Sequence, residues 1–197
     1  MRAMTTWVAA VALAWSAAAA AVEVAGVRID DKASVGGQEL VLNGAGLRTK
    51  VFFKVYVAGL YVPAKAGSLA AVLEKAPRRV QLTLMRDVSA EEFVEALVDG
   101  IKANTTAAEL AAAKAGIDQL SAIGKSLGQV REKEVVTLDF VDGGTKVAVN
   151  GAAKGTIPGE AFNQALLKIW LGDSPVQADL KKALLGAAMK VFYDVRS

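Results

Sequence analysis

Residues 42–62 read LNGAGLRTKVFFKVYVAGLYV, and this stretch decides the fold. Gly44 and Gly46 mark a turn, and the run after them is rich in Val, Phe and Tyr, which is typical of a strand. Pro63 ends the run because proline cannot donate a hydrogen bond to a sheet ladder. The pattern predicts a turn followed by one long β-strand, with Arg48 at its start.

The two faces of this strand differ, because side chains alternate across a strand. The odd face, from Leu47 to Gly59, is nearly all apolar and is predicted to be core. The even face, from Arg48 to Leu60, mixes cations with aromatic residues. Two interpretations of it stay open: a solvated face, or a pocket with an aromatic floor and a cationic mouth. On one extended strand, Arg48 and Tyr56 would lie about 26 Å apart, so they meet only if the strand bends or the ligand is long.

The rest of the chain alternates between strand and helix patterns. Short strands are predicted over 22–29 and 39–44, a half-buried strand over 79–86, and a hairpin that turns at Asp142–Gly143. Helix patterns occupy 68–75, the middle of the chain and the C-terminal third, where one helix ends at Gly172. Three pairs have the spacing of a capping box at a helix start: Ser89 with Glu92, Thr106 with Glu109, and Ser174 with Gln177. The order predicts a single α+β domain.

The N-terminus has the order of a secretory signal peptide. Residues 1–21 begin with a charged start, continue as an apolar run and end in small residues. We expect cleavage near Ala20 or Ala21, a mature domain over 22–197, and a periplasmic or secreted location. No later run is long enough to span a bilayer, and we expect a monomer.

Composition excludes several classes of function. Without Arg2, 22 basic side chains face 20 acidic ones, whereas nucleic-acid binding needs a basic stripe. The chain has no His and no Cys, which disfavours zinc and copper sites, Ser–His–Asp triads and thiol chemistry. We expect no metal, cofactor or nucleic-acid partner.

Two segments resemble the chalcone isomerase-like family. GAGLR (44–48) and KVYVAGLY (54–61) are similar to its Gly-x-Gly-x-Arg turn and following strand, and residues 136–185 are similar to its C-terminal hairpin and two helices. The resemblance runs from about residue 35 to residue 186. It implies an open-faced β-sandwich, in which a large antiparallel sheet packs against a layer of helices with a ligand cleft between them.

The resemblance also implies a choice between catalysis and binding. Plant chalcone–flavanone isomerases add a phenolate to an enone within one molecule, whereas plastid relatives bind fatty acids and use an arginine to do so. The isomerase arginine matches Arg48, but the other catalytic positions differ. Where the isomerases carry threonine, tyrosine, lysine, asparagine and Ser/Thr, this chain has Tyr56, Phe93, Ala96, Gly100 and Asn163.

These departures favour a non-catalytic protein that binds a small, elongated, apolar anion such as a fatty acid. A guanidinium holds a carboxylate or phenolate unaided but is a poor proton shuttle, so Arg48 is the expected anchor, and the only catalytic candidate if the chain is an isomerase. Two alternatives stay open: an intramolecular lyase acting on a phenolic enone, and an envelope interaction protein whose Arg48 pairs internally, for instance with Glu39. The predicted ligand-binding residues are Arg48, Phe52, Tyr56, Phe93, Leu97, Phe162 and Asn163, with Leu166 in the same apolar lining.

Overall fold

A computed structural model describes residues 21–74 and 76–187. The predicted signal peptide lies outside the described residues except for Ala21, which begins the first strand. In chain order the elements are β1 Ala21–Val24, β2 Val27–Asp30, β3 Lys32–Val35, β4 Gln38–Lys50, β5 Phe53–Val62, α1 Leu69–Leu73, β6 Arg78–Leu84, β7 Val88–Ser89, α2 Ala90–Ala103, α3 Ala107–Leu127, β8 Gln129–Val130, β9 Val135–Val141, β10 Gly144–Val149, β11 Ala152–Pro158, α4 Glu160–Leu171 and α5 Ala178–Leu184.

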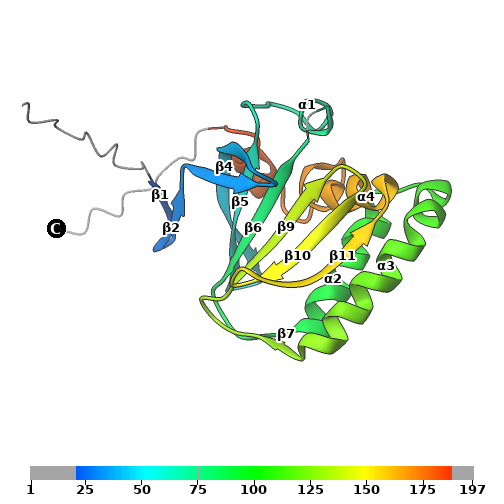
Figure 1. The fold of residues 1–197 in the computed structure, drawn as a ribbon. Coiled ribbons are helices and arrows are strands. Elements are labelled where there is room, and N and C mark those ends of the chain that lie inside the picture. The colour runs from blue at the N-terminus through cyan, green and yellow to red at the C-terminus, as the bar shows by residue number, and fades with distance from the viewer. Residues whose placement is uncertain (1–20, 75, 188–197) are drawn as a thin grey trace, which may run out of the picture.

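The architecture is one large antiparallel sheet with helices on one face, accompanied by two small two-stranded sheets, β1–β2 and β7–β8. Seven strands follow the order β11-β10-β9-β6-β5-β4-β3. Helices α2, α3 and α4 cover one face, and the β1–β2 hairpin lies on the opposite side (Figure 1). This is the α+β fold with a large antiparallel sheet that the sequence predicts.

The stretch 42–62 is a hairpin, so the prediction of one long strand is wrong. β4 ends at Lys50, Val51 and Phe52 form the turn, and β5 returns from Phe53. The turn escaped prediction because neither central residue is Gly, Asn or Asp, the usual residues of two-residue hairpin loops. Residues 22–29 likewise form the β1–β2 hairpin rather than a single strand.

The even face of the hairpin is buried from Tyr56 to Leu60 but exposed near the turn, at Lys50, Phe52 and Lys54. On β5, Tyr56, Ala58 and Leu60 enter the main core beneath the helices. Val57 and Tyr61 point the other way, into a smaller core that the β1–β2 hairpin covers. Burial on both faces explains why apolar residues run almost continuously along β5.

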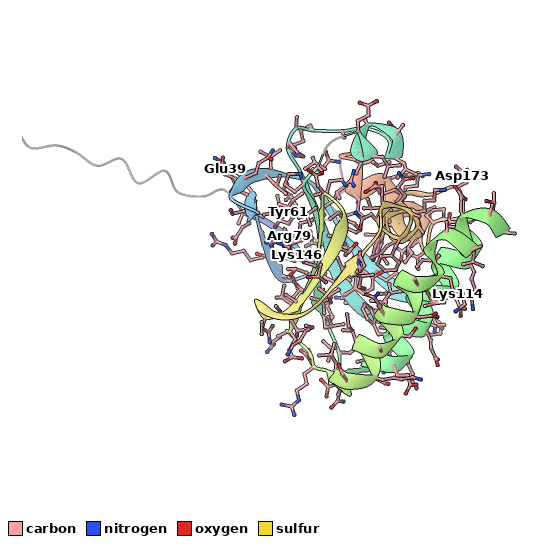
Figure 2. The ribbon with its side chains drawn as sticks, turned by 45° about the vertical axis from the view of Figure 1, so that its right-hand side comes forward. Glu39, Tyr61, Arg79, Lys114, Lys146 and Asp173 are labelled. Atoms are coloured by element: carbon pink, nitrogen blue, oxygen red, sulfur yellow. The ribbon has the colours of Figure 1, made fainter. Side chains whose placement is uncertain are left out.

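One charged row crosses the outer face of the sheet. Tyr61 pairs with Arg79, Arg79 with Asp139, and Asp139 with Lys146, on four successive strands; Figure 2 shows Tyr61, Arg79 and Lys146 close together. Arg79 donates two hydrogen bonds to the Asp139 carboxylate, at 2.5 and 2.7 Å. Its charge is therefore matched within the protein.

The two glycines of GAGLR allow α5 to lie directly on β4. A Cβ atom at Gly44 would overlap the Ala183 carbonyl oxygen and lie 2.9 Å from the Leu184 carbonyl oxygen. At Gly46 it would lie 2.9 Å from both the Ala183 Cβ and the Leu180 Cδ1. Side chains at these positions would push the helix off the sheet. The glycines thus serve a helix–sheet contact and not the turn predicted from them.

Helix ends follow the sequence signals in part. Thr106 and Glu109 form the predicted capping box, and Gly172 is the C-cap of α4. Ser89 caps α2 by accepting from the Glu92 backbone amide. The third predicted box is wrong, because α5 begins later and Gln177 is its N-cap residue. No helix within the described ranges is long and apolar enough to cross a membrane.

Gly44→Ala is expected to destabilise the protein by about 1–3 kcal/mol, the usual cost of overpacking, because the new methyl group meets backbone atoms that cannot rotate away. Urea unfolding measures the change. Gly67→Ala is the matched control, since a Cβ atom there meets nothing within 4 Å. Equal stability of the two variants would contradict the close contact of α5 with β4.

Candidate functional site

Arg48 lies at the end of β4, directly opposite Tyr56 on β5. The hairpin makes these two residues cross-strand neighbours, so no bend or long ligand is needed to bring them together. Opposed residues on one sheet face have Cβ atoms about 5 Å apart. Arg48 is half-buried, and the Tyr56 side chain is 4% exposed.

Gln177 fixes the backbone around Arg48. Its Oε1 accepts from the Thr49 backbone amide at 3.0 Å, and its Nε2 donates to the Leu47 carbonyl oxygen at 3.2 Å. The same Oε1 lies 3.4 Å from Arg48 Nη1. Gln177, the N-cap residue of α5, thereby connects that helix to the end of β4. The sequence did not indicate this role, because the spacing of Gln177 from Ser174 predicted a capping box.

Within the described residues, the hydrogen-bond acceptors around the guanidinium are neutral. Arg48 Nη1 donates to the Thr49 carbonyl oxygen and, weakly, to Gln177. Among the ion pairs of residues 21–74 and 76–187, none involves Arg48. Glu39, the partner considered from the sequence, pairs instead with Lys32 at 2.8 Å. No carboxylate of the described residues therefore balances the charge of Arg48.

Tyr56 is held in place by a second buried side chain, Trp170. The Trp170 indole donates to Tyr56 Oη at 3.0 Å, with both groups in the main core. Burial raises the pKa of the Tyr56 phenol, and the Trp170 hydrogen bond and the nearby Arg48 charge offset part of that rise. The phenol is thus neutral near pH 7 and poorly suited to act as a base.

Phe93 lies between an internal cavity and an open groove. Its ring packs edge-on against Tyr56, with centroids 6.1 Å apart at 89°. It lines a wholly apolar cavity of about 30 Å³ between the sheet and helices α2 and α3, where Leu97 also lies. It also lines a groove of about 440 Å³ beside the β4–β5 turn. The cavity holds only about two water molecules at that volume, so it is too small for an acyl chain as it stands.

Three of the predicted ligand residues lie elsewhere. Phe52 is 93% exposed in the hairpin turn, so it lines no apolar pocket under the helices. Phe162 is 1% exposed and packs under Gly116 of α3 as ordinary core. Asn163 is fully buried, where it accepts from Thr145 and donates to the Val141 carbonyl oxygen at 3.3 Å. The side-chain amide of Asn163 therefore makes its hydrogen bonds within the protein and not with a ligand.

The structure therefore assembles part of the predicted site. It gathers Arg48, Tyr56 and Phe93, adds Trp170 and Gln177, and places Leu97 in the cavity beyond them. None of these groups is suited to transfer protons at neutral pH, because the guanidinium stays charged and the pKa of the Tyr56 phenol is raised. No cluster of three or more potential metal ligands occurs within the described parts of the chain.

Comparisons with known proteins identify the family and the fold. A profile described as chalcone isomerase-like matches residues 21–186. The chain belongs to the chalcone isomerase-like family. Among solved structures it is similar to a fatty-acid binding protein of Arabidopsis thaliana, at 15% identity and a TM-score of 0.66, covering 85% of this chain and 96% of that one. At this identity the similarity supports the fold alone. No curated protein sequence matches the chain.

Alkaline pH tests the burial of Tyr56. Because its folded pKa is raised above the unfolded value of about 10, it stabilises the fold fully below that pH and loses this contribution as the pH rises through the folded pKa. Unfolding free energies of wild type and Tyr56→Phe, measured from pH 8 to 12, are expected to run parallel at first. Above pH 10 the wild type is expected to fall more steeply. Ionisation of Tyr56 below pH 10 would contradict this placement.

Proposed function

We propose that this protein binds an elongated apolar carboxylate, such as a fatty acid, with Arg48 as the anchor and no catalysis. The observation that carries the proposal is the half-buried Arg48 guanidinium, which has neutral acceptors but no described carboxylate beside it. Burying an unpaired charge is costly, and a carboxylate matches the planar fork of a guanidinium in shape and charge. A bound carboxylate would therefore stabilise the site that the fold leaves unmatched.

The surroundings of Arg48 suit an acyl chain. Tyr56 and Trp170 form an aromatic wall, and Phe93 continues it toward the wholly apolar cavity. We propose that the chain enters from the open groove, displaces Phe93 and occupies the enlarged cavity, while the carboxylate meets Arg48 and the Tyr56 hydroxyl. Burial of the chain supplies affinity in proportion to its apolar area.

Two further facts support binding over isomerisation. Phe93, Ala96 and Gly100 supply no acid, base or hydrogen-bond donor from their side chains where the isomerases carry polar groups. Tyr56, the nearest phenol, has a raised pKa. The fold is shared with a protein named for fatty-acid binding, which makes an acyl ligand the first class to test. Residues 1–21 predict that the protein meets this ligand after export.

Replacing Arg48 is expected to weaken dodecanoate binding. Loss of hydrogen bonds to a charged group reduces affinity roughly ten- to a hundredfold for Arg48→Gln, with Arg48→Lys in between because the charge survives but the fork does not. Calorimetric titration of delipidated protein with dodecanoate measures this. Arg28→Gln, an exposed arginine on β2, is the control and should bind like wild type.

Two results would overturn the proposal. Dodecanol binding as tightly as dodecanoate would mean that no cation anchors the head group. Loss of binding in Arg86→Gln but not in Arg48→Gln would place the carboxylate in the outer groove, which Arg86 lines, and not at the β4–β5 site.

A further inference from the structure

The β4–β5 turn exposes large apolar side chains at one point. Val51, Phe52 and Phe53 are 79%, 93% and 60% exposed, and among the described residues only Val22, at 44%, joins them as an exposed large hydrophobic residue. We call residues 50–54, Lys-Val-Phe-Phe-Lys, the apolar tip. Scattered apolar side chains on a surface are ordinary, but a contiguous set at a projecting turn indicates contact with a partner.

The backbone of the apolar tip argues against a purely structural role. Val51 has φ of +57°, a conformation that β-branched residues rarely adopt. Asn or Gly would relieve the strain in a two-residue turn. Strained residues concentrate at sites of function. Here the strained turn carries an exposed valine and an exposed phenylalanine at positions where polar residues are usual.

The charges around the apolar tip select the partner. Lys50 and Lys54 flank the three apolar residues and are exposed, and the Arg86 guanidinium lies 4.9 Å from the centre of the Phe53 ring. The tip contains no acidic residue. Asp87 and Glu92 line the adjoining groove, and the Asp87 carboxylate is engaged by the Glu132 backbone amide at 2.8 Å. The tip thus presents exposed apolar side chains flanked by three cations, Lys50, Lys54 and Arg86.

We infer that the apolar tip inserts into the surface of an anionic lipid bilayer. Aromatic and aliphatic side chains enter the boundary between head groups and acyl chains, while flanking lysines reach back to the lipid phosphates. Three side chains are too few for a stable protein interface, which needs about 800 Å² from each partner. This inference does not depend on the Arg48 ligand, although the groove lined by Lys50, Val51 and Phe53 would then face the lipid.

Vesicle sedimentation tests the inference with a double variant, Val51→Gly with Phe52→Asn. Within the turn, Val51 has a positive φ and Phe52 does not, and glycine is the favoured residue at the first position of such a hairpin turn, so the melting temperature should stay the same or rise. Binding to vesicles of equal parts phosphatidylglycerol and phosphatidylcholine should fall at least tenfold. Phe52→Ser is a second variant that changes one 93% exposed side chain, and its binding should fall in the same direction. Val22→Ser is the control for loss of an exposed apolar residue and should bind like wild type.

Charge variants test the electrostatic part. Lys50→Gln and Lys54→Gln should each weaken binding to the anionic vesicles roughly fivefold, and binding of the wild type should fall with added salt. The double variant Lys146→Gln and Lys154→Gln removes two charges from β10 and β11, twice as many as either single change, and should have little effect. Lys146 aligns across the sheet with Leu42 of β4, eight residues before Lys50, so this control lies away from the apolar tip.

Three outcomes would overturn the inference. The first is equal vesicle binding by wild type and the variant with Val51→Gly and Phe52→Asn. The second is equal loss in the Lys146 and Lys154 control. The third is a concentration-dependent dimer in ultracentrifugation that the variant with Val51→Gly and Phe52→Asn abolishes without any vesicle binding by the wild type, which would make the apolar tip a contact between copies of this chain. A direct readout is Phe52→Trp, whose fluorescence should shift to the blue on anionic vesicles and stay unchanged on pure phosphatidylcholine.

Discussion

The approach of α5 to β4 is the contact on which the site depends. Gly44 and Gly46 leave no side chains between the helix and the strand, so Gln177, at the start of α5, reaches the backbone on both sides of Arg48. The close packing of protein interiors makes such a contact nearly all-or-none. A displaced helix would remove Gln177 from Leu47 and Thr49, and the end of β4 would lose its brace.

The same contact holds the charged Arg48 side chain near the core. Arg79, on the outer face, donates two hydrogen bonds to the Asp139 carboxylate. Among the described residues, Arg48 instead donates to neutral oxygens of Thr49 and Gln177. Tyr56 and its donor Trp170 complete the wall opposite. An arginine that the fold positions but does not neutralise has the chemistry of an anion anchor, and we propose that the apolar space behind Phe93 selects an anion with an acyl chain.

The sequence predicted the class of fold and several element boundaries, because Gly, Pro and alternating apolar residues act locally. The role of Arg48 as an anchor stays a prediction. It failed where tertiary contacts decide. The Val51–Phe52 turn contains no residue typical of hairpin turns, so the sequence predicted one strand where there is a hairpin. The pairing of Arg48 with Tyr56 could therefore not be predicted. Gln177 carried a helix-start spacing but serves a partner 128 residues away in the chain. Phe162 and Asn163 were predicted to line a ligand pocket, yet both lie in the packed core.

The most direct test of the account is the ionisation of the ligand itself. Carbon-13 NMR of carboxyl-labelled dodecanoate, titrated with acid in complex with the protein, reports the pKa of the bound carboxyl group. A neighbouring guanidinium favours the charged form, so the bound carboxyl is predicted to stay ionised to lower pH than the free acid, and to lose this depression in Arg48→Gln. A bound carboxyl that titrates at or above the pKa of the free acid in the wild type would contradict the central role of Arg48.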